Sequence, residues 1–489
     1  MTPNYHYSLA ISEGGEFDVI SFKLTEGLSE PFRLELMLSS FQPTIAFSAL
    51  MDKPATFTFW QDGNPVRYVN GIVSRFSQEK TGAVRTYYRM VVEPALIRAA
   101  LQSDSRIFQH QPSEKILCTL LQKNRVDNVT FEPLPLAWER EYCVQYRETD
   151  LAFMERLAAE EGWYYYFEHH QDSHRLHFAH QSPTTPISAT LPYHACSGGD
   201  RPFAGLWQWR YKCRVTPNRQ TLRDYTFLHP HYNLEHQHHA PSSMASSPSP
   251  SAVNSDKVYE KYDYPGRYKR DEQGSPFSRY RLEAERVWGE TAEGVGNDMR
   301  VIPGHAYQLE GHPHAPFNRE WLAVRVEHHG VQTGILEEEA GDEGNHYENR
   351  LLVIPLHTPW RSAPKPRPII RGTHIAHVVG PEGEEIYCDE WGRVKLQFPW
   401  DRQGHVDEHS SCWVRVSQDW AGAQYGSQMI PRVGDEVLVK YLNGDPDQPI
   451  VIGRTYHATT PPPYRLPEHK TRMTIKSKSH KGNGFNELR

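Results

Sequence analysis

Short runs in which apolar and polar residues alternate, separated by turn residues, constrain the fold of this chain most. Residues 32–38, 55–59 and 87–91 each alternate with the period of two that places one face of a strand in a core. Turn sequences such as Asp62-Gly63-Asn64-Pro65 separate these runs. Residues 1–100 are therefore predicted to form an antiparallel β-barrel or sandwich.

Three later stretches show the spacing of amphipathic helices instead. Ser113 begins one with apolar residues at positions 116, 117, 120 and 121, and Thr149 caps a second, which Gly162 ends. The third covers residues 279–297, although two glycines weaken its second half. The predicted fold class is therefore mainly β with a few helices (α+β).

Two stretches are predicted to lack regular structure. Residues 236–256 are rich in His, Ser and Pro and carry too little apolar surface to offset the entropy of ordering, so we expect a mobile loop there. Residues 359–368 are rich in proline, which removes backbone donors, and they predict an extended linker.

The segment after this linker has the pattern of a small closed barrel. Five short strands within about 80 residues match the size and strand count of an OB-type Greek-key barrel. The turn Asn443-Gly444-Asp445-Pro446-Asp447 separates the last two. The predicted strands cover residues 375–379, 394–398, 412–416, 436–441 and 450–453.

Bulk properties limit the partners and the compartment. A length of 489 residues predicts three or four domains. A net charge of −7 without a long basic run argues against binding to nucleic acid or membrane surfaces, so no nucleic-acid partner is predicted. Six cysteines without a CxxC pair are typical of reduced thiols. The N-terminus lacks signal-peptide features, so we expect synthesis in the cytoplasm without a signal peptide and export by another route.

Sequence motifs of common enzymes are missing. The chain has no GxSxG elbow, no HExxH, no GxxxxGK[ST], and no GxGxxG after a strand. We therefore predict that the protein is not an enzyme. No catalytic, cofactor-binding or metal-ligating residue is assigned, and no cofactor is expected.

Histidines invite one further hypothesis, a metal site. Two histidines form an HxH pair that a strand would point to one face, and five more follow the aromatic strand at residues 163–167. Histidine spacing alone is weak evidence for a metal, so we favour histidines that decorate loops and exposed strand faces. The residues are His312 and His314 in the pair, and His169, His170, His174, His177 and His180 in the cluster.

Two acidic pairs and one basic group suggest other functions of the barrel. Glu384-Glu385 and Asp389-Glu390 invite a glycosidase interpretation, but neighbours in sequence point apart, so a solvated acidic rim is favoured. Arg393, Lys395 and Trp413 offer charge and stacking for a single nucleic-acid strand. The acidic flanks of the barrel oppose that interpretation.

Longer motifs carry a family resemblance over nearly the whole chain. Five runs in the barrel region resemble the OB domain of the VgrG family, the spike proteins of type VI secretion, and four earlier runs resemble the hub region of that family. The barrel runs are residues 384–401, 411–416, 420–422, 430–437 and 444–454. The hub runs are residues 145–151, 161–167, 262–268 and 303–307.

The resemblance implies a phage baseplate hub fused to a spike. Its expected parts are a first hub barrel (1–100), a hub α/β region (101–200), a second hub barrel region (201–365), an OB domain (370–457), and the start of a stalk without order (458–489). It implies a homotrimer that caps a tube of Hcp hexamers, contacts baseplate proteins, carries effector proteins, and holds a PAAR-repeat protein through a stalk that we expect to be missing here. No lysozyme domain follows the barrel, so no muralytic activity is implied.

The resemblance also gives roles to particular residues of the OB region. Three glycines are interpreted as turn or bulge positions, and three tryptophans as core or interface anchors. An alternative function is a carbohydrate- or cell-wall-binding or hydrolysing protein that uses the OB barrel. The glycines are Gly392, Gly434 and Gly444, and the tryptophans are Trp391, Trp400 and Trp413.

Overall fold

The computed structural model describes residues 4–11, 15–42, 44–82, 84–135, 138–181, 187–195, 204–240, 258–332 and 345–489. These residues form two compact units. The barrel unit contains residues 1–99, 119–135 and 154–365, and the OB unit contains residues 100–118, 136–153 and 366–489. The predicted fold class is confirmed, because strands far outnumber helices along the described chain.

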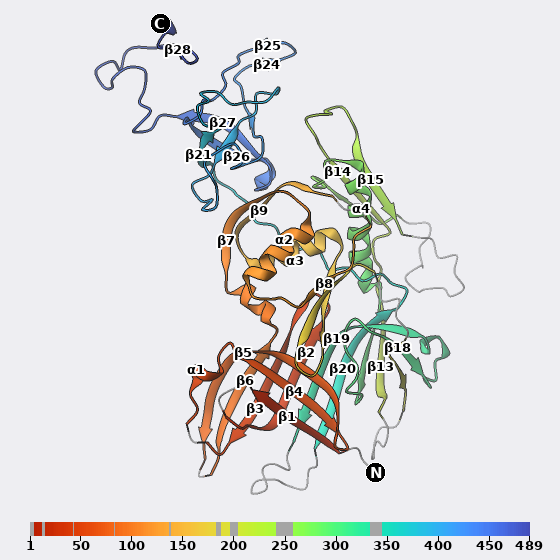
Figure 1. Ribbon diagram of the computed structural model, residues 1–489. Coiled ribbons are helices and arrows are strands. Elements are labelled where there is room, and N and C mark those ends of the chain that lie inside the picture. Colours follow the sequence, from red (N-terminus) through yellow and green to blue (C-terminus); the bar gives the residue numbers. More distant parts are fainter. Residues whose placement is uncertain are drawn as a thin grey trace. The chain divides into compact units, whose positions relative to one another are not determined.

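Six antiparallel strands close the first barrel of the barrel unit (Figure 1). Their order is β1-β4-β5-β6-β3-β2, and pairing of β1 with β2 returns the sheet to its start. The alternating runs of the sequence lie within β3, β4 and β6, as predicted. Helix α1 (Phe47–Leu50) lies between β3 and β4. The strands are β1 (Tyr5–Ile11), β2 (Asp18–Gly27), β3 (Glu30–Ser40), β4 (Pro54–Gln61), β5 (Asn64–Thr81) and β6 (Thr86–Glu93).

A second barrel continues from the same sheet. Its order is β12-β18-β19-β20-β17-β13, and a parallel bridge between Tyr193 and Leu206 brings its two ends together. Antiparallel pairing of β19 with β2, from Arg325 opposite Gly27 to Val331 opposite Ser21, joins the barrels edge to edge. The strands are β12 (Ala189–Pro192), β13 (Leu206–Cys213), β17 (Glu290–Gly296), β18 (Ala306–Glu310), β19 (Glu320–Val331) and β20 (His346–Pro355).

Two of the predicted helices are confirmed. Helix α2 covers Ser113–Lys123, and α3 covers Asp150–Glu161. The Thr149 hydroxyl accepts the Ala152 amide at 3.1 Å, which is an N-cap bond, and Gly162 ends α3 with a φ of 77°. The barrel unit also contains a three-stranded sheet, made of β8 (Val129–Phe131), which precedes α3 in the chain, and of β10 (Tyr164–His169) and β11 (His174–Ala179), which come after it.

The third predicted helix begins and ends earlier than expected. Helix α4 covers Asp271–Arg286 and packs on β14 (Arg219–Asp224) and β15 (Leu234–His239), with β16 (Glu260–Asp263) beside β14. The prediction of helix up to residue 297 was wrong, because residues 290–296 form β17 between β13 and β20. Strand pairing of β17 with both β13 and β20 outweighs the helical spacing of the apolar residues in this segment. A Cβ at Gly296 would lie 2.5 Å from the Gly205 carbonyl oxygen, so the close approach requires glycine.

The expected mobile loop differs from the structure in part, whereas residues 359–368 form no helix or strand, as a linker requires. Residues 236–239 belong to β15, because they pair with β14, and residues 241–257 lie outside the described residues. Two residues near the start of the linker, Trp360 and Arg361, are buried. Trp360 packs on Tyr164, and Arg361 forms an ion pair with Glu283 at 2.7 Å. Its first part is therefore fixed within the barrel unit.

The OB unit contains the closed barrel that the sequence predicts. Its order is β22-β21-β26-β27-β23, and an antiparallel bridge between Val394 and Val414 connects the end strands. Buried Val378, Leu396, Phe398, Val437 and Val439 contribute to its core. The strands are β21 (His374–Val379), β22 (Lys395–Gln397), β23 (Arg415–Val416), β26 (Glu436–Tyr441) and β27 (Pro449–Thr455).

Three two-stranded elements complete the OB unit. The ribbon of β7 (Ser103–Gln111) and β9 (Arg140–Thr149) belongs here, although we expected residues 101–200 to form a hub region. A small hairpin is formed by β24 (Ala421–Gly422) and β25 (Tyr425–Gly426). Another is formed by β28 (Ile475–Lys478) and β29 (Phe485–Leu488), in a segment where we expected no order. No helix in the described part of the chain is long and apolar enough to cross a membrane.

The end of α3 gives a stability prediction. A Cβ at Gly162 would lie 2.9 Å from the Tyr280 ring, and its φ is in the left-handed region. Gly162→Ala should therefore combine backbone strain of about 1–2 kcal/mol with steric overlap of about 1–3 kcal/mol. Gly63→Ala is the matched control, because Gly63 has a φ of 80° and a Cβ there would meet no described atom within 4 Å. Urea unfolding should show the larger loss for Gly162→Ala, and equal losses would contradict the packing.

Candidate functional site

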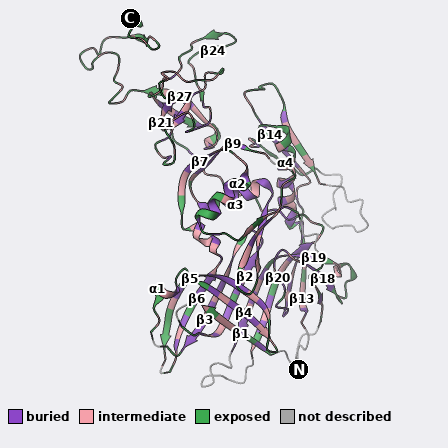
Figure 2. Cartoon of the chain, in the orientation of Figure 1, coloured by how far each residue is buried: buried purple, intermediate pink, exposed green. Residues whose placement is uncertain are grey.

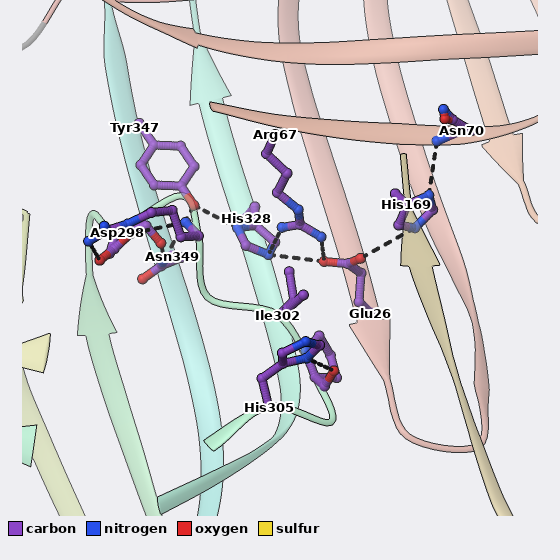
Figure 3. A network of polar contacts seen from close by, with 12 residues as sticks. Glu26, Arg67, Asn70, His169, Asp298, Ile302, His305, His328, Tyr347 and Asn349 are labelled. Carbon is purple, nitrogen blue, oxygen red and sulfur yellow. Dashed lines mark hydrogen bonds and ion pairs between the residues drawn. The ribbon is translucent and has the colours of Figure 1, made fainter. Parts of the chain in front are cut away.

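A buried ion pair lies at the seam between the two barrels (Figure 3). Glu26 comes from β2 and Arg67 from β5, and the guanidinium binds the carboxylate directly. His328 from β19 places its Nε2 atom 3.0 Å from Arg67 Nη1 and 3.2 Å from Glu26 Oε2. None of the three residues is more than 8% exposed. The ion pair therefore joins two strands of the first barrel, and His328 connects it to β19 of the second.

Polar contacts extend the ion pair into the second barrel. His328 Nδ1 lies 2.6 Å from the Tyr347 hydroxyl on β20. The Asn349 side chain donates to that hydroxyl at 3.2 Å and to the Asp298 carbonyl oxygen at 2.6 Å. Because a guanidinium can only donate, His328 Nε2 accepts from Arg67 and the ring proton lies on Nδ1. The histidine thus relays hydrogen bonds from β5 to β20.

A second histidine reaches the pair from β10. The Asn70 amide donates to His169 Nδ1 at 3.0 Å, so the ring proton must be on Nε2, which lies 3.9 Å from Glu26 Oε1. The Asn70 side chain donates to the His170 carbonyl oxygen at 2.8 Å. The three-stranded sheet is thereby tied to the first barrel at the same point.

The charges of this network follow from its burial. Burial lowers the pKa of His169 to about 3 and that of His328 to about 4, so both rings are neutral at pH 7. Burial alone would raise the pKa of Glu26, but the Arg67 guanidinium holds it well below its usual range. Glu26 and Arg67 are therefore the two charges, and each neutralises the other. Such an arrangement suits the alignment of strands rather than the turnover of a substrate.

A second constellation joins the ribbon to the OB barrel within the OB unit. The β9 side chains Tyr142 and Tyr146 pack against the barrel core. The Tyr146 ring lies 5.7 Å from that of Trp400, and its hydroxyl is 3.3 Å from His374 Nε2. His374 Nδ1 lies 2.9 Å from the Tyr441 hydroxyl on β26. Two ribbon tyrosines therefore complete the barrel core.

The turn predicted between the last two strands holds the ribbon in place. Asp447 Oδ1 accepts the Val144 amide of β9 at 2.7 Å, and Asp447 Oδ2 accepts from Arg367 at 3.2 Å. Asp445 is 3% exposed and accepts the Asp447 amide at 3.2 Å, which orients the second aspartate. We call Val144, Arg367, Asp445 and Asp447 the ribbon joint. The turn at residues 443–447 therefore reverses the chain and also holds the ribbon.

Of the histidines that the sequence grouped, His169 and His174 lie side by side with ring centroids 5.8 Å apart, whereas His177 and His180 have other partners. His180 is buried, the His169 side chain is only 5% exposed, and His180 Nε2 lies 2.9 Å from the Tyr280 hydroxyl. His177 Nε2 lies 2.9 Å from Glu168. His312 and His314 follow β18 in a turn, so the expectation for a strand does not apply to them. In the described ranges, no three His, Cys, Asp or Glu side chains are placed to hold a metal ion.

The acidic pairs have structural contacts. Glu385 binds Arg432 at 3.0 Å and accepts the Lys481 amide at 3.1 Å, while Glu384 lies 3.3 Å from Lys481 Nζ. Asp389 accepts the amides of Trp391 and Arg393 and pairs with the Arg393 guanidinium at 2.6 Å. Such contacts fix loops and the C-terminal hairpin.

The remaining candidates of the OB region are mostly engaged in packing. Lys395 lies over the Trp413 ring at 4.9 Å and donates to the Ser411 carbonyl oxygen, and Tyr387 packs on the same ring at 5.0 Å. Trp400 stacks on Phe398, whereas Trp391 is 56% exposed. The three glycines have positive φ, as turn positions require, with 68° at Gly392, 92° at Gly434 and 75° at Gly444.

Sequence reasoning missed Glu26, Arg67 and His328, and it named Asp447 only as a turn residue. Glu26, Arg67 and His328 occupy buried positions of alternating strands, where apolar residues are usual. A charged residue in the inward phase of a strand is therefore the signal that could have identified them. Asp447 gave no such signal, because aspartate is common in turns.

Comparison with known proteins identifies the family. Residues 25–334 match the family model of the phage tail baseplate hub (GPD), and residues 387–456 match that of the type VI secretion system/phage-baseplate injector OB domain. The chain is 49% identical over 492 residues to the type VI secretion system spike protein VgrG2a of Pseudomonas aeruginosa, covering 99% of this chain and 57% of that protein. The chain belongs to the VgrG family.

Other relatives agree with this assignment. VgrG3 of Vibrio cholerae is 42% identical over 94% of this chain and 44% of its own length. The actin cross-linking toxin VgrG1 of Vibrio cholerae is 43% identical over 94% of this chain and 41% of its own length. This VgrG chain thus spans about half the length of the curated relatives it matches. The E. coli c3393 protein, a type VI component similar to the T4 tail proteins gp27 and gp5, shares the fold with a TM-score of 0.65 at 18% identity, covering 92% of this chain and all of that chain.

Neutral buried histidines predict that this VgrG chain loses stability in acid. Between pH 6.5 and about 4 the unfolded chain binds a proton at each of His169 and His328 while the folded chain does not. Each histidine should then remove about 1.4 kcal/mol of unfolding free energy per pH unit as the pH falls. His328→Gln keeps an acceptor and a donor but cannot titrate, so its stability should fall less steeply. Urea unfolding at pH 6.5, 5.5 and 4.5 measures both slopes, and identical slopes would contradict this origin.

The ribbon joint predicts a local effect at Asp447. Asp447→Ala removes the acceptor of the Val144 amide, so that amide should exchange with deuterium about ten-fold faster or more, since a lost hydrogen bond is worth about 1–2 kcal/mol. Asp447→Asn is the matched control, because its side-chain oxygen can still accept from Val144 while the charge facing Arg367 is lost. Hydrogen exchange with mass spectrometry of residues 140–149 is the measurement. Equal exchange in Asp447→Ala and the native chain would contradict the joint.

Proposed function

We propose that this chain is the trunk of the puncturing device of the type VI secretion system, a structural component that is not an enzyme. The family assignment supports this role, since the matched families are a tail hub and an injector OB domain. A device that transmits force needs rigid domains and large interfaces more than a catalytic pocket. The two constellations described above hold strands and domains in alignment, which fits that requirement.

The pair of joined barrels is the observation that carries this proposal. Each chain supplies two six-stranded barrels in one sheet, joined by β2 and β19. Three chains around one axis would present six barrels, the number that matches a hexameric tube ring. The trimer would therefore cap a tube of Hcp hexamers and contact the baseplate proteins around it. It would be made in the cytoplasm without a signal peptide and leave the cell through the type VI system.

The C-terminal hairpin supports a trimer as well. Strands β28 and β29 are almost entirely exposed, although they carry large apolar side chains. A two-stranded hairpin without a core is at best marginally stable alone. Three copies would supply that core to one another and begin a stalk, at whose tip a PAAR-repeat protein would bind. The exposed apolar residues are Met473, Ile475, Phe485 and Leu488.

Effector delivery completes the proposed role. The name of one relative describes an actin cross-linking toxin, and this chain spans only 41% of that protein. We propose effector proteins as partners that travel with the trimer. The alternative of a carbohydrate-binding or hydrolysing protein finds less support, because the Trp413 ring already has Lys395 and Tyr387 as neighbours.

The trimer gives the first test. Light scattering across a concentration range should report three times the mass of one chain. Ile475→Asp combined with Phe485→Asp should lower the trimer's stability at least ten-fold, because charges would enter the shared core. Lys476→Asp with Glu487→Lys is a control that alters charge on the same hairpin without adding charge at an apolar position. A native chain that is monomeric at every concentration would contradict the assembly, and deletion of the gene without loss of Hcp export would contradict the function.

A further inference from the structure

An uncharged and exposed hairpin projects from the OB barrel. Residues 420–429 read Trp-Ala-Gly-Ala-Gln-Tyr-Gly-Ser-Gln-Met and contain no charged side chain, in a chain with 23% charged residues. Trp420 is 64% exposed and Tyr425 63% exposed (the hairpin of β24 is green in Figure 2). We call residues 420–429 the aromatic finger. Exposed aromatic side chains without neighbouring charge are typical of interfaces between proteins.

The aromatic finger has its shape before it meets a partner. The Ser427 amide donates to the Trp420 carbonyl oxygen at 2.8 Å, and Ala421 pairs with Gly426. Gly426 has a φ of 136°, and a Cβ there would lie 2.3 Å from that same oxygen. The Tyr425 ring covers Gly422 and meets the Trp420 ring edge to face at 5.9 Å. Binding would therefore cost little conformational entropy.

The base of the finger is held by the barrel. The Met429 amide donates to Gln418 Oε1 at 3.2 Å. The Arg454 guanidinium from β27 donates to the Met429 carbonyl oxygen. The finger is thus a rigid projection of the OB unit. Arg454, the cationic residue beside it, binds the backbone at the base of the finger.

A second apolar surface lies on the outer face of the same barrel. Ile375 on β21 stands opposite Leu438 on β26, and Ile452 follows on β27. Ile375 is 46% and Ile452 44% exposed, while the next side chains along β26, Val437 and Val439, fill the core. The outer face of such a sheet is usually polar. We call Ile375, Leu438 and Ile452 the apolar stripe.

These two surfaces do not cover each other within one chain, since both stay exposed. We propose that the aromatic finger of one chain docks on the apolar stripe of a second copy of the chain. Contact between two different patches is head-to-tail, and a head-to-tail contact repeated around a three-fold axis closes into a ring. This inference rests on the proposed trimer and assigns the surfaces that form it in the OB region.

The exposed C-terminal hairpin of the OB unit favours a second copy of the chain as the partner of the finger and the stripe. The coreless hairpin β28–β29 belongs to the same OB unit and requires other copies beside it, which would bring their OB barrels around the same axis. The side chains of the finger and of the stripe are uncharged and match each other in chemistry, while Glu436, Lys440 and Arg454 flank the stripe on the same face. Trp420 and Tyr425 together could bury on the order of 200–300 Å² of aromatic surface, so the contact would act jointly with others in the trimer.

Cross-linking between isotopically distinct chains tests the contact. A photoreactive phenylalanine derivative replaces Tyr425 in the full chain, and nitrogen-14 and nitrogen-15 chains are mixed during assembly. We expect cross-links from position 425 to residues 374–379 or 449–455 of the differently labelled chain. A trimer whose cross-links fall only within one chain or on other segments overturns the docking but leaves the proposed function standing. A chain that never forms a trimer overturns both.

Substitutions on the stripe supply a second measurement. Ile452→Glu should weaken the trimer at least ten-fold in dilution experiments, because a charge would be buried under the finger. Ile452→Leu should behave as the native chain. Thermal unfolding of each variant reports whether the barrel still folds, which is expected since position 452 faces outward. A folded Ile452→Glu chain with native trimer stability would overturn the assignment of the stripe.

Discussion

The ion pair between Glu26 and Arg67 is the interaction on which the arrangement of the two barrels depends. Its two charges are buried, and taking each from water costs several kcal/mol unless the other lies beside it. A slip of one residue in either strand would turn a charge to the opposite face and leave its partner unpaired. His328 extends the same requirement to β19, across the seam. The pair therefore contributes more to the choice of register than to net stability.

The OB unit uses the same principle at the ribbon joint. Asp447 accepts from a backbone amide of the ribbon with one oxygen and from Arg367 with the other, while ribbon tyrosines fill the barrel core. Apolar burial supplies the attraction, and the directional contacts of a carboxylate fix the orientation. In both units, ionised groups serve alignment between segments far apart in sequence. Fixed contacts of this kind suit a structural role, because such a role does not require either network to change.

Local patterns predicted the elements far better than the contacts between them. Strands β3, β4 and β6, the capped helix α3 and the five OB strands follow from period, caps and turns, which are encoded within a few residues. Strand β17 was missed because pairing with β13 and β20 decides its conformation. The ion pair escaped prediction for a similar reason, since positions 26, 67 and 328 meet only after both barrels have formed. The uncharged composition of the aromatic finger was visible in the sequence, but its exposure was not.

Charge and apolar surface are thus divided in an unusual way along this chain. Buried charges align segments within each unit, while the aromatic finger, the apolar stripe and the C-terminal hairpin of the OB unit present exposed apolar residues. Exposed apolar surface favours association, and in a protein that acts alone it would promote aggregation. Covering such a patch with another surface is therefore favourable. Because the internal polar groups already fix each unit as a rigid body, covering these patches requires no rearrangement, and assembly of preformed units is the simplest state that satisfies the whole surface.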